Sequence, residues 1–159
     1  MGNQSKRVVF VLPTYKEEAN IQNTIQKIYN QPINGDDYVF HVLVVDDNSP
    51  DNTQSIVKSL MEQNENIQLL TGPKIGLGNA YKRGFQYAIQ TLNADIVFQM
   101  DSDGQHDCSL IPSFLEGLRK GSDVIIGSRF IEGGSVPNFS LFRRLIHLNK
   151  IFFYVILSH

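Results

Sequence analysis

The chain has 159 residues, of which 42% are hydrophobic and 19% charged, and its formal net charge is −2. This length permits one domain with a sizeable core, and the weakly acidic balance argues against a surface that binds nucleic acid. Cys108 is the only cysteine, so no disulfide can form within the chain, which is typical of a reducing compartment. Residues 1–6 form a polar arm that lacks the apolar centre of a signal peptide.

Apolar runs alternate with helical patterns along the rest of the chain. In chain order we predict a strand at 8–12, a helix at 17–29, a strand at 39–45, a helix that starts at 49–51, a strand at 66–70, a helix at 76–92, a strand at 94–100, a helix at 110–119 and a strand at 123–127. Continuous Val/Ile strands that alternate with helices are typical of a mostly parallel sheet with helices on both faces. The predicted fold class is therefore α/β and Rossmann-like, and ligands of such folds bind at the carboxyl ends of the strands.

Two carboxylates one residue apart follow the predicted strand 94–100. Asp101 and Asp103 come directly after this fourth strand and place oxygen ligands at its carboxyl end. At the end of the first strand, by contrast, Pro13 is predicted to stop the strand. Mg²⁺ or Mn²⁺ suits a site made of such carboxylates, water and the phosphates of a substrate. A plain acidic turn is the alternative, and His106 fits either a third ligand or a packed histidine.

The first two strands are also followed by polar side chains. Tyr15 and Glu17 can hold a base and its ribose, although Glu17 also complements a helix N-terminus. Asp47 can accept a hydrogen bond from a base or ribose, while its neighbours up to Thr53 suit a turn and a helix cap.

Two further segments lie where phosphate could bind. Gly76–Tyr81 opens a predicted helix, but Tyr81 stands where a dinucleotide-binding loop needs its third glycine. The glycine-rich loop still allows close backbone contact with phosphate or sugar. Arg129, after the fifth strand, can pair with a diphosphate or form a structural ion pair.

Together, these segments resemble the family-2 glycosyltransferases of the GT-A fold, and most of all the polyprenyl-phosphate group that includes the dolichol-phosphate mannosyltransferases. The resemblance covers roughly residues 7–150 and is carried by Pro13–Glu17, Asp46–Thr53, Gly76–Tyr81, Met100–His106 and Gly127–Phe130. The chain departs from the family pattern at four positions, with Lys16 for Asn, Asn52 for Gly, Gly104 for Leu and Phe130 for Tyr.

The resemblance implies a nucleotide-sugar-binding GT-A domain over residues 7–135. It implies that the donor is held by Pro13, Tyr15, Glu17, Val45, Asp47, Asp101, Ser102, Asp103, Gln105 and Arg129. It further implies Mg²⁺ or Mn²⁺ on Asp101, Asp103 and Gln105, and catalytic roles for Asp103 and Arg129.

The implied reaction is a metal-dependent, inverting transfer of a hexose, mannose from GDP-mannose, to a polyprenyl or dolichyl phosphate. The implied location is peripheral, on the cytoplasmic side of a membrane (the endoplasmic reticulum in a eukaryote), at the membrane surface or with a membrane subunit. Two alternatives stay open: a glycosyltransferase with a saccharide hydroxyl acceptor, and a truncated chain that binds a nucleotide sugar without activity.

Residues 136–159 form an apolar segment with interspersed basic residues. Within it, 151–157 is uncharged but too short to span a bilayer. We predict a helix that either lies in a membrane interface or packs in a core. The resemblance implies that the chain is truncated here relative to the family.

Overall fold

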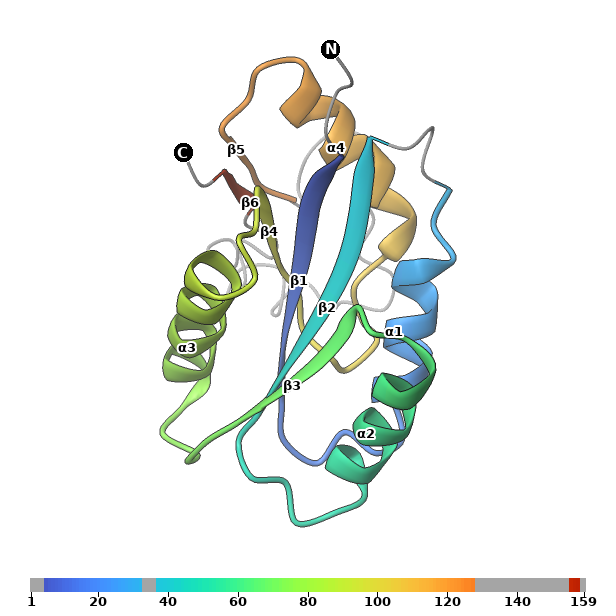
Figure 1. The fold of residues 1–159 in the computed structure, drawn as a ribbon, viewed down its shortest axis with the longest axis vertical. Coiled ribbons are helices and arrows are strands. Elements are labelled where there is room, and N and C mark those ends of the chain that lie inside the picture. The colour runs from blue at the N-terminus through green and yellow to red at the C-terminus, as the bar shows by residue number, and fades with distance from the viewer. Residues whose placement is uncertain (1–4, 33–36, 128–154, 158–159) are drawn as a thin grey trace, which may run out of the picture.

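Six strands form one sheet in the order β3-β2-β1-β4-β6-β5, and helices lie on both of its faces (Figure 1). The computed structural model describes residues 5–32, 37–127 and 155–157. The strands are β1 (Lys6–Thr14), β2 (Tyr38–Asp46), β3 (Ile67–Thr71), β4 (Ile96–Gln99), β5 (Val124–Ile125) and β6 (Val155–Leu157). The helices are α1 (Ile21–Tyr29), α2 (Thr53–Gln63), α3 (Leu77–Gln90) and α4 (Ile111–Arg119), with a short 3₁₀ turn at Cys108–Leu110.

Strands β1 to β4 are parallel, as the sequence predicts. All nine residues of β1 pair with β2, from Lys6 opposite Tyr38 to Thr14 opposite Asp46, and β1 pairs with β4 on its other side. Strand β3 extends the sheet beyond β2. The carboxyl ends of β1, β2 and β4 therefore lie at one edge of the sheet, where the sequence predicts the site.

The first strand is longer than predicted, because Pro13 lies inside it and does not stop it. Pro13 pairs with Val45 of β2, while the pairing of β1 with β4 ends at Val11 opposite Gln99. The carbonyl of Pro13 accepts a hydrogen bond from Ser102, which follows β4. The missing N–H of the proline thus falls on the β4 side, beyond the end of that ladder, where it removes no strand hydrogen bond.

The fifth strand, predicted over 123–127, is present but shorter than predicted. Strand β5 has two residues, and β6 separates it from β4, pairing antiparallel with both. The prediction of a helix in the C-terminal segment is wrong for Val155–Leu157, which form β6. The rest of that segment, like Arg129, lies outside the described residues.

The first helix begins at Ile21, four residues later than predicted. The backbone N–H groups of Glu17 and Glu18 donate to Thr53, the first residue of α2, and to Asp51 in the loop before it. These residues therefore join two loops at the edge of the sheet, and the helix starts after them.

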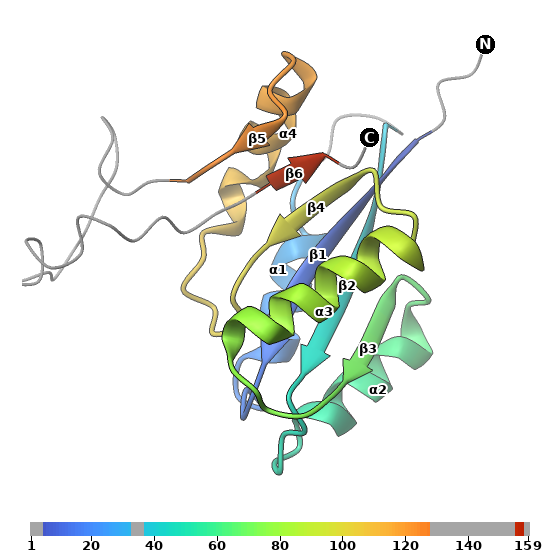
Figure 2. The same cartoon turned by 90° about the vertical axis from the view of Figure 1, so that its left-hand side faces the viewer.

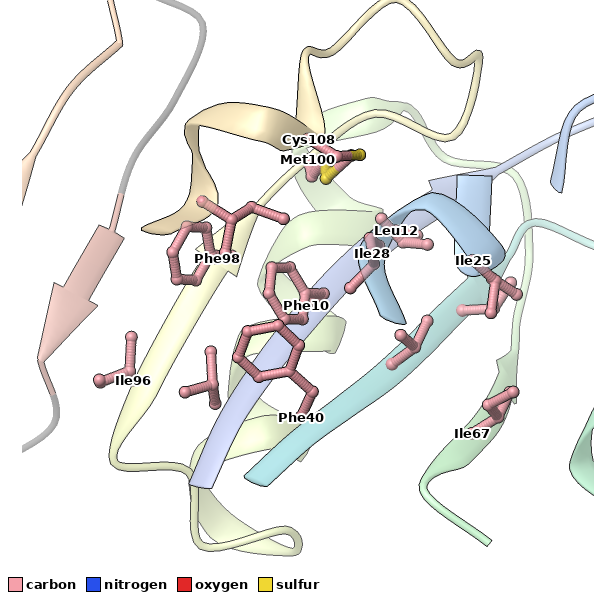
Figure 3. Packing of buried hydrophobic residues seen from close by; sticks show 14 of the residues in the cluster. Phe10, Leu12, Ile25, Ile28, Phe40, Ile67, Ile96, Phe98, Met100 and Cys108 are labelled. Carbon is pink, nitrogen blue, oxygen red and sulfur yellow. The ribbon is translucent and has the colours of Figure 1, made fainter. Parts of the chain in front are cut away.

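Alternate residues of β1 enter two separate cores. Phe10 and its neighbours on the same face pack with α1, α2 and α4, and ring centroids lie 4.7 Å apart for Phe10 and Phe98 and 4.9 Å apart for Phe10 and Phe40 (Figure 3). On the other face, Val9 and Val11 pack against α3, which crosses the sheet alone in the described part of the chain (Figure 2). Burial of both faces fixes the strand register and with it the edge that carries the site.

Helix α3 approaches the sheet closely at Gly84. A Cβ at this position would overlap Cγ1 of Val11 and lie 2.9 Å from Cγ2 of Val45. Only glycine permits this approach, which places the N-terminus of α3 beside the carboxyl ends of β1 and β4.

Among the described residues, no helix has the length and apolar character to cross a bilayer.

Candidate functional site

A cleft of about 310 Å³ opens at the carboxyl edge of the sheet. Its walls come from the ends of β1, β2 and β4, from the loop after β3 and from the start of α3. The lining residues are Pro13, Thr14, Tyr15, Glu17, Asp47, Lys74, Gly76, Leu77, Ala80, Asp101, Ser102 and Asp103. Four segments that are far apart in the sequence, 13–17, 47, 74–80 and 101–103, thus meet in one cavity.

Hydrogen bonds join the loops after β1 and β2. The N–H of Lys16 donates to Oγ of Ser49 at 3.0 Å, next to the bonds that Glu18 makes to the same loop and Glu17 makes to the start of α2. Lys16 and Asn48 both have left-handed backbones, with φ of 61° and 53°. These uncommon conformations turn each loop sharply at the end of its strand and hold the cleft side chains in place.

The two aspartates that end β2 have different roles. Asp46 is fully buried and accepts hydrogen bonds from the backbone and hydroxyl of Ser49 and from the amide of Gln54. Those bonds occupy its carboxylate and shape the loop. Asp47 lines the cleft, so it is the member of the pair that can contact a ligand.

Arg83 of α3 holds Asp47 in position, a role that the sequence analysis missed. Its Nη2 lies 2.7 Å from Oδ1 of Asp47, and both side chains are mostly buried. The guanidinium also packs against Gly72, where a Cβ would lie 2.9 Å from it, and donates to the carbonyl of Pro73 at 3.4 Å. Arg83 therefore connects β2, α3 and the loop after β3.

The acidic loop after β4 is fastened from two sides. The hydroxyl of buried Ser102 donates to the carbonyl of Pro13 at 2.8 Å, and the hydroxyl of Thr24 on α1 donates to the carbonyl of Ser102 at 3.1 Å. Oδ1 of Asp103 accepts from the N–H of Gln105 at 2.9 Å. These bonds hold the two cleft aspartates at the end of β1.

Asp101 is held by an aromatic hydroxyl and an imidazole. The hydroxyl of Tyr81 donates to Oδ1 at 2.6 Å, and Nε2 of the buried His106 lies 3.3 Å from Oδ2. His106, with Tyr81, lowers the pKa of Asp101, while burial and the carboxylate raise the pKa of Tyr81 well above its usual range. Asp101 is therefore an anion and Tyr81 a neutral donor at neutral pH.

The cleft suits a divalent cation that binds together with a phosphate substrate. No three His, Cys, Asp or Glu side chains within residues 5–32, 37–127 and 155–157 are grouped so that they could hold a metal alone. Asp101 and Asp103 nevertheless both face the cleft. Two carboxylates completed by water and phosphate are an ordinary set of ligands for Mg²⁺ or Mn²⁺.

The structure brings most of the sequence-predicted site residues together. The predicted residues that line the cleft are Pro13, Tyr15, Glu17, Asp47, Asp101, Ser102 and Asp103. Val45 is buried in the core below the cleft, so its side chain does not reach it, and Gln105 is exposed outside the lining. Arg129 lies outside the described residues.

Three site residues were not assigned from the sequence. Tyr81 and Arg83 lie on one helix that the glycine-rich segment opens, and Nζ of Lys74 lies 3.3 Å from the ring centroid of Tyr15. Tyr81 belongs to the glycine-rich segment 76–81 that the sequence analysis singled out, so its position there was a usable signal. Arg83 and Lys74 carried no local signal, because their partners are distant in the sequence.

The chain is similar to known glycosyltransferases in sequence and in structure. Residues 9–157 match the family described as Glycosyl transferase family 2. A dolichol-phosphate mannosyltransferase of Pyrococcus furiosus is 35% identical over 147 residues, which are 91% of this chain and 39% of that protein. The chain thus spans well under two thirds of the length of that relative.

Two solved structures resemble the fold. TarS of S. aureus in complex with UDP superposes with a TM-score of 0.68 at 21% identity, over 95% of this chain and 46% of that chain, and this likeness shows the GT-A fold. A mannosyltransferase of Pyrobaculum calidifontis in complex with GDP-Man and Mn²⁺ superposes with a TM-score of 0.52 at 28% identity, over 62% of this chain and 28% of that chain. The predicted α/β fold of the GT-A type is confirmed.

Proposed function

Because the chain belongs to glycosyl transferase family 2, we propose that it transfers a hexose, mannose from GDP-mannose, to a polyprenyl or dolichyl phosphate. The observation that carries the proposal is the cleft, which places Tyr15 and Asp47 together with Asp101 and Asp103. An aromatic ring and carboxylates at one end suit a nucleoside, and metal-binding carboxylates at the other suit a diphosphate.

The nucleoside half of the donor is assigned to the joined loops after β1 and β2. Tyr15 offers a ring face, and Glu17 and Asp47 offer carboxylate acceptors for ribose hydroxyls or a base. Arg83 fixes the carboxylate of Asp47, so a ligand meets an acceptor that is already oriented. Such preorganisation lowers the entropic cost of binding.

The diphosphate half is assigned to the acidic loop. Asp101 and Asp103 would hold Mg²⁺ or Mn²⁺, which would supply Lewis-acid stabilisation to the departing diphosphate. The Pyrobaculum mannosyltransferase, solved with GDP-Man and Mn²⁺, supports this assignment. Gln105 follows them in the same loop but lies outside the lining of the cleft, so we do not assign it to the metal. We assign Arg129 to the same phosphates, because a guanidinium matches phosphate geometry.

The proposed chemistry is a single displacement at the anomeric carbon. An oxygen of the acceptor phosphate forms the new bond to that carbon while the bond to the diphosphate oxygen breaks, and the electron pair leaves with the nucleoside diphosphate. Attack opposite the leaving group inverts the configuration. The acceptor phosphate is already ionised at neutral pH, so this reaction needs no general base, unlike transfer to a hydroxyl.

The acceptor and location follow from the same proposal. The Pyrococcus relative is named a dolichol-phosphate mannosyltransferase, and a lipid phosphate acceptor lies at a membrane surface. We therefore place the protein peripherally on the cytoplasmic side of a membrane, either directly at its surface or through a membrane subunit.

The first experiment is calorimetric titration of the chain with GDP and with UDP, each with and without Mn²⁺. We expect Mn²⁺-dependent binding that favours GDP and is lost in Asp103→Ala, while Ser55→Ala on α2 serves as a neutral control. Preference for UDP would change the donor, and no binding of either would overturn the proposal.

A transfer assay then identifies the acceptor. Labelled GDP-mannose is offered with polyprenyl phosphate or with saccharides, in vesicles and in detergent. Product on polyprenyl phosphate supports the proposal. Product on a saccharide alone would mean a hydroxyl acceptor, and donor binding without any product would mean a chain that binds but does not transfer.

A further inference from the structure

Lys74 is the one cation among the described residues that line the cleft. It lies in the loop between β3 and α3, and it faces Glu17, Asp47, Asp101 and Asp103 across the same cavity. A nucleoside diphosphate is itself an anion, so the carboxylates repel it. Among the described side chains that line the cleft, Lys74 is therefore the one whose charge attracts the phosphates of a nucleoside diphosphate.

The ammonium of Lys74 lies on an aromatic face. Its Nζ is 3.3 Å from the ring centroid of Tyr15, which is well within the range of a cation–π contact. Lys16, the other lysine near this ring, has its Nζ at 5.6 Å and is not part of the cleft lining. The ring thus holds the ammonium of Lys74 at the cleft.

The loop that carries Lys74 is anchored beneath. The N–H of Gly72 donates to the carbonyl of Asp46 at 3.0 Å, and Arg83 supports Gly72 and Pro73 from α3. The same guanidinium neutralises Asp47. The backbone that leads to Lys74 is therefore set in place, while its side chain is exposed and is held only by the contact with Tyr15 that the structure shows.

We propose that Lys74 is a donor-binding residue that supplies positive charge to the phosphates of the nucleoside diphosphate, after the base displaces its ammonium from the ring of Tyr15. This inference rests on the proposed function, because it assigns the nucleoside to Tyr15. The base and the ammonium of Lys74 cannot occupy the same face of the Tyr15 ring at the same time, so binding of the base releases the ammonium toward the cleft. The contact with Tyr15 keeps the charge at the cleft before the donor binds.

The proposal predicts opposite effects on two ligands that share a base. Lys74→Met removes the charge for the phosphates and also frees the ring. We expect the affinity for GDP to fall about tenfold, as for loss of one charge-assisted hydrogen bond. The affinity for guanosine, which has no phosphate, is expected to stay equal or to rise.

The test is calorimetric titration of the full chain at fixed Mn²⁺ with GDP, guanosine and inorganic pyrophosphate. Lys82→Met, on the exposed side of α3, makes the same change of charge outside the cleft, and Lys16→Met removes the more distant lysine. Both controls are expected to bind GDP within about twofold of the wild type. Weaker GDP and pyrophosphate binding with unchanged or tighter guanosine binding, seen only in Lys74→Met, supports the proposal.

Other outcomes separate this inference from the proposed function. Equal loss of GDP and guanosine binding in Lys74→Met would overturn the inference, because the residue would then shape the pocket instead of serving the phosphates. Unchanged GDP binding would also overturn it, while leaving the proposed function intact. A wild-type chain that binds neither GDP nor UDP would overturn the proposed function itself.

Discussion

The hydroxyl of Tyr81 on α3 donates a 2.6 Å hydrogen bond to Oδ1 of Asp101, which follows β4. This bond connects a helix on one face of the sheet to the acidic loop at its edge. His106 lies 3.3 Å from the other oxygen of the same carboxylate. The two contacts fix the plane of a carboxylate that we assign to the metal, so the orientation of α3 and the geometry of the metal site depend on each other.

Removal of the Tyr81 hydroxyl tests this dependence. In Tyr81→Phe the carboxylate of Asp101 loses one donor, and we expect a loss of about 1 kcal/mol of stability, since the side chain of Asp101 is partly exposed to water. Binding of GDP with Mn²⁺ is expected to weaken several-fold, because Asp101 must be oriented again. Urea denaturation and calorimetry measure the two effects. Tyr87→Phe on the same helix is the control, and equal Mn²⁺-dependent binding in both variants would contradict the coupling.

The Arg83–Asp47 ion pair is expected to be coupled. Arg83→Met leaves a buried carboxylate without its partner, so we expect a destabilisation of about 2–3 kcal/mol. Asp47→Asn is expected to cost less, and the double variant is expected to show a coupling energy of about 1–2 kcal/mol. Urea unfolding of the four proteins measures this cycle. Additive effects would show that the two side chains act independently. Arg83→Lys tests whether a positive charge alone, without the guanidinium, is enough to keep the stability that the ion pair contributes.

The fold could be predicted from the sequence because its signals are local. Each signal lies within a window of about ten residues: the apolar runs of β1, β2 and β4, and the glycine-rich start of α3. The strand-end residues Tyr15, Asp47 and Asp101 were found because parallel strands bring their carboxyl ends to one edge.

The parts that could not be predicted depend on pairing between distant residues. The apolar run at 151–157 is compatible with a strand or with a buried helix, and the pairing of β6 with β4 and β5, which decides between them, is not visible in the local sequence. Arg83 is recognised as a site residue only once α3 is packed on the sheet and Asp47 is within reach. Pro13 read alone predicts a strand end, whereas the neighbouring ladder decides its effect.

Two glycines of α3 give a matched test of the close packing between helix and sheet. Gly84→Ala is expected to destabilise by about 1–3 kcal/mol, because its Cβ would overlap Val11 and press on Val45. Gly78→Ala, where no atom lies within 4 Å of the new Cβ, is expected to stabilise by up to about 1 kcal/mol through helix propensity. Thermal and urea unfolding measure both variants. Stabilisation by both substitutions would contradict the packing argument.

The pH dependence of stability tests the environment of Asp101. The pKa of this carboxyl is lowered in the folded chain, chiefly by His106 and also by Tyr81, from an ordinary value of 3.8. Near and below pH 3.8 the carboxyl of Asp101 takes up a proton more readily in the unfolded chain than in the folded chain. The contacts of the ionised carboxylate therefore stabilise the fold fully above pH 3.8. This stabilisation is lost as the pH falls through the pKa of the folded state. Asp101→Asn removes this titration.

We therefore expect Asp101→Asn to be less stable than the wild type at about pH 7, and the difference to shrink steadily as the pH falls below about 4. Urea unfolding across this range measures it. Glu62→Gln, at an exposed position of α2, removes one carboxylate elsewhere and is expected to differ little from the wild type throughout. A difference between Asp101→Asn and the wild type that grows toward low pH would mean that folding disfavours the ionised carboxylate, contrary to the contacts of Tyr81 and His106.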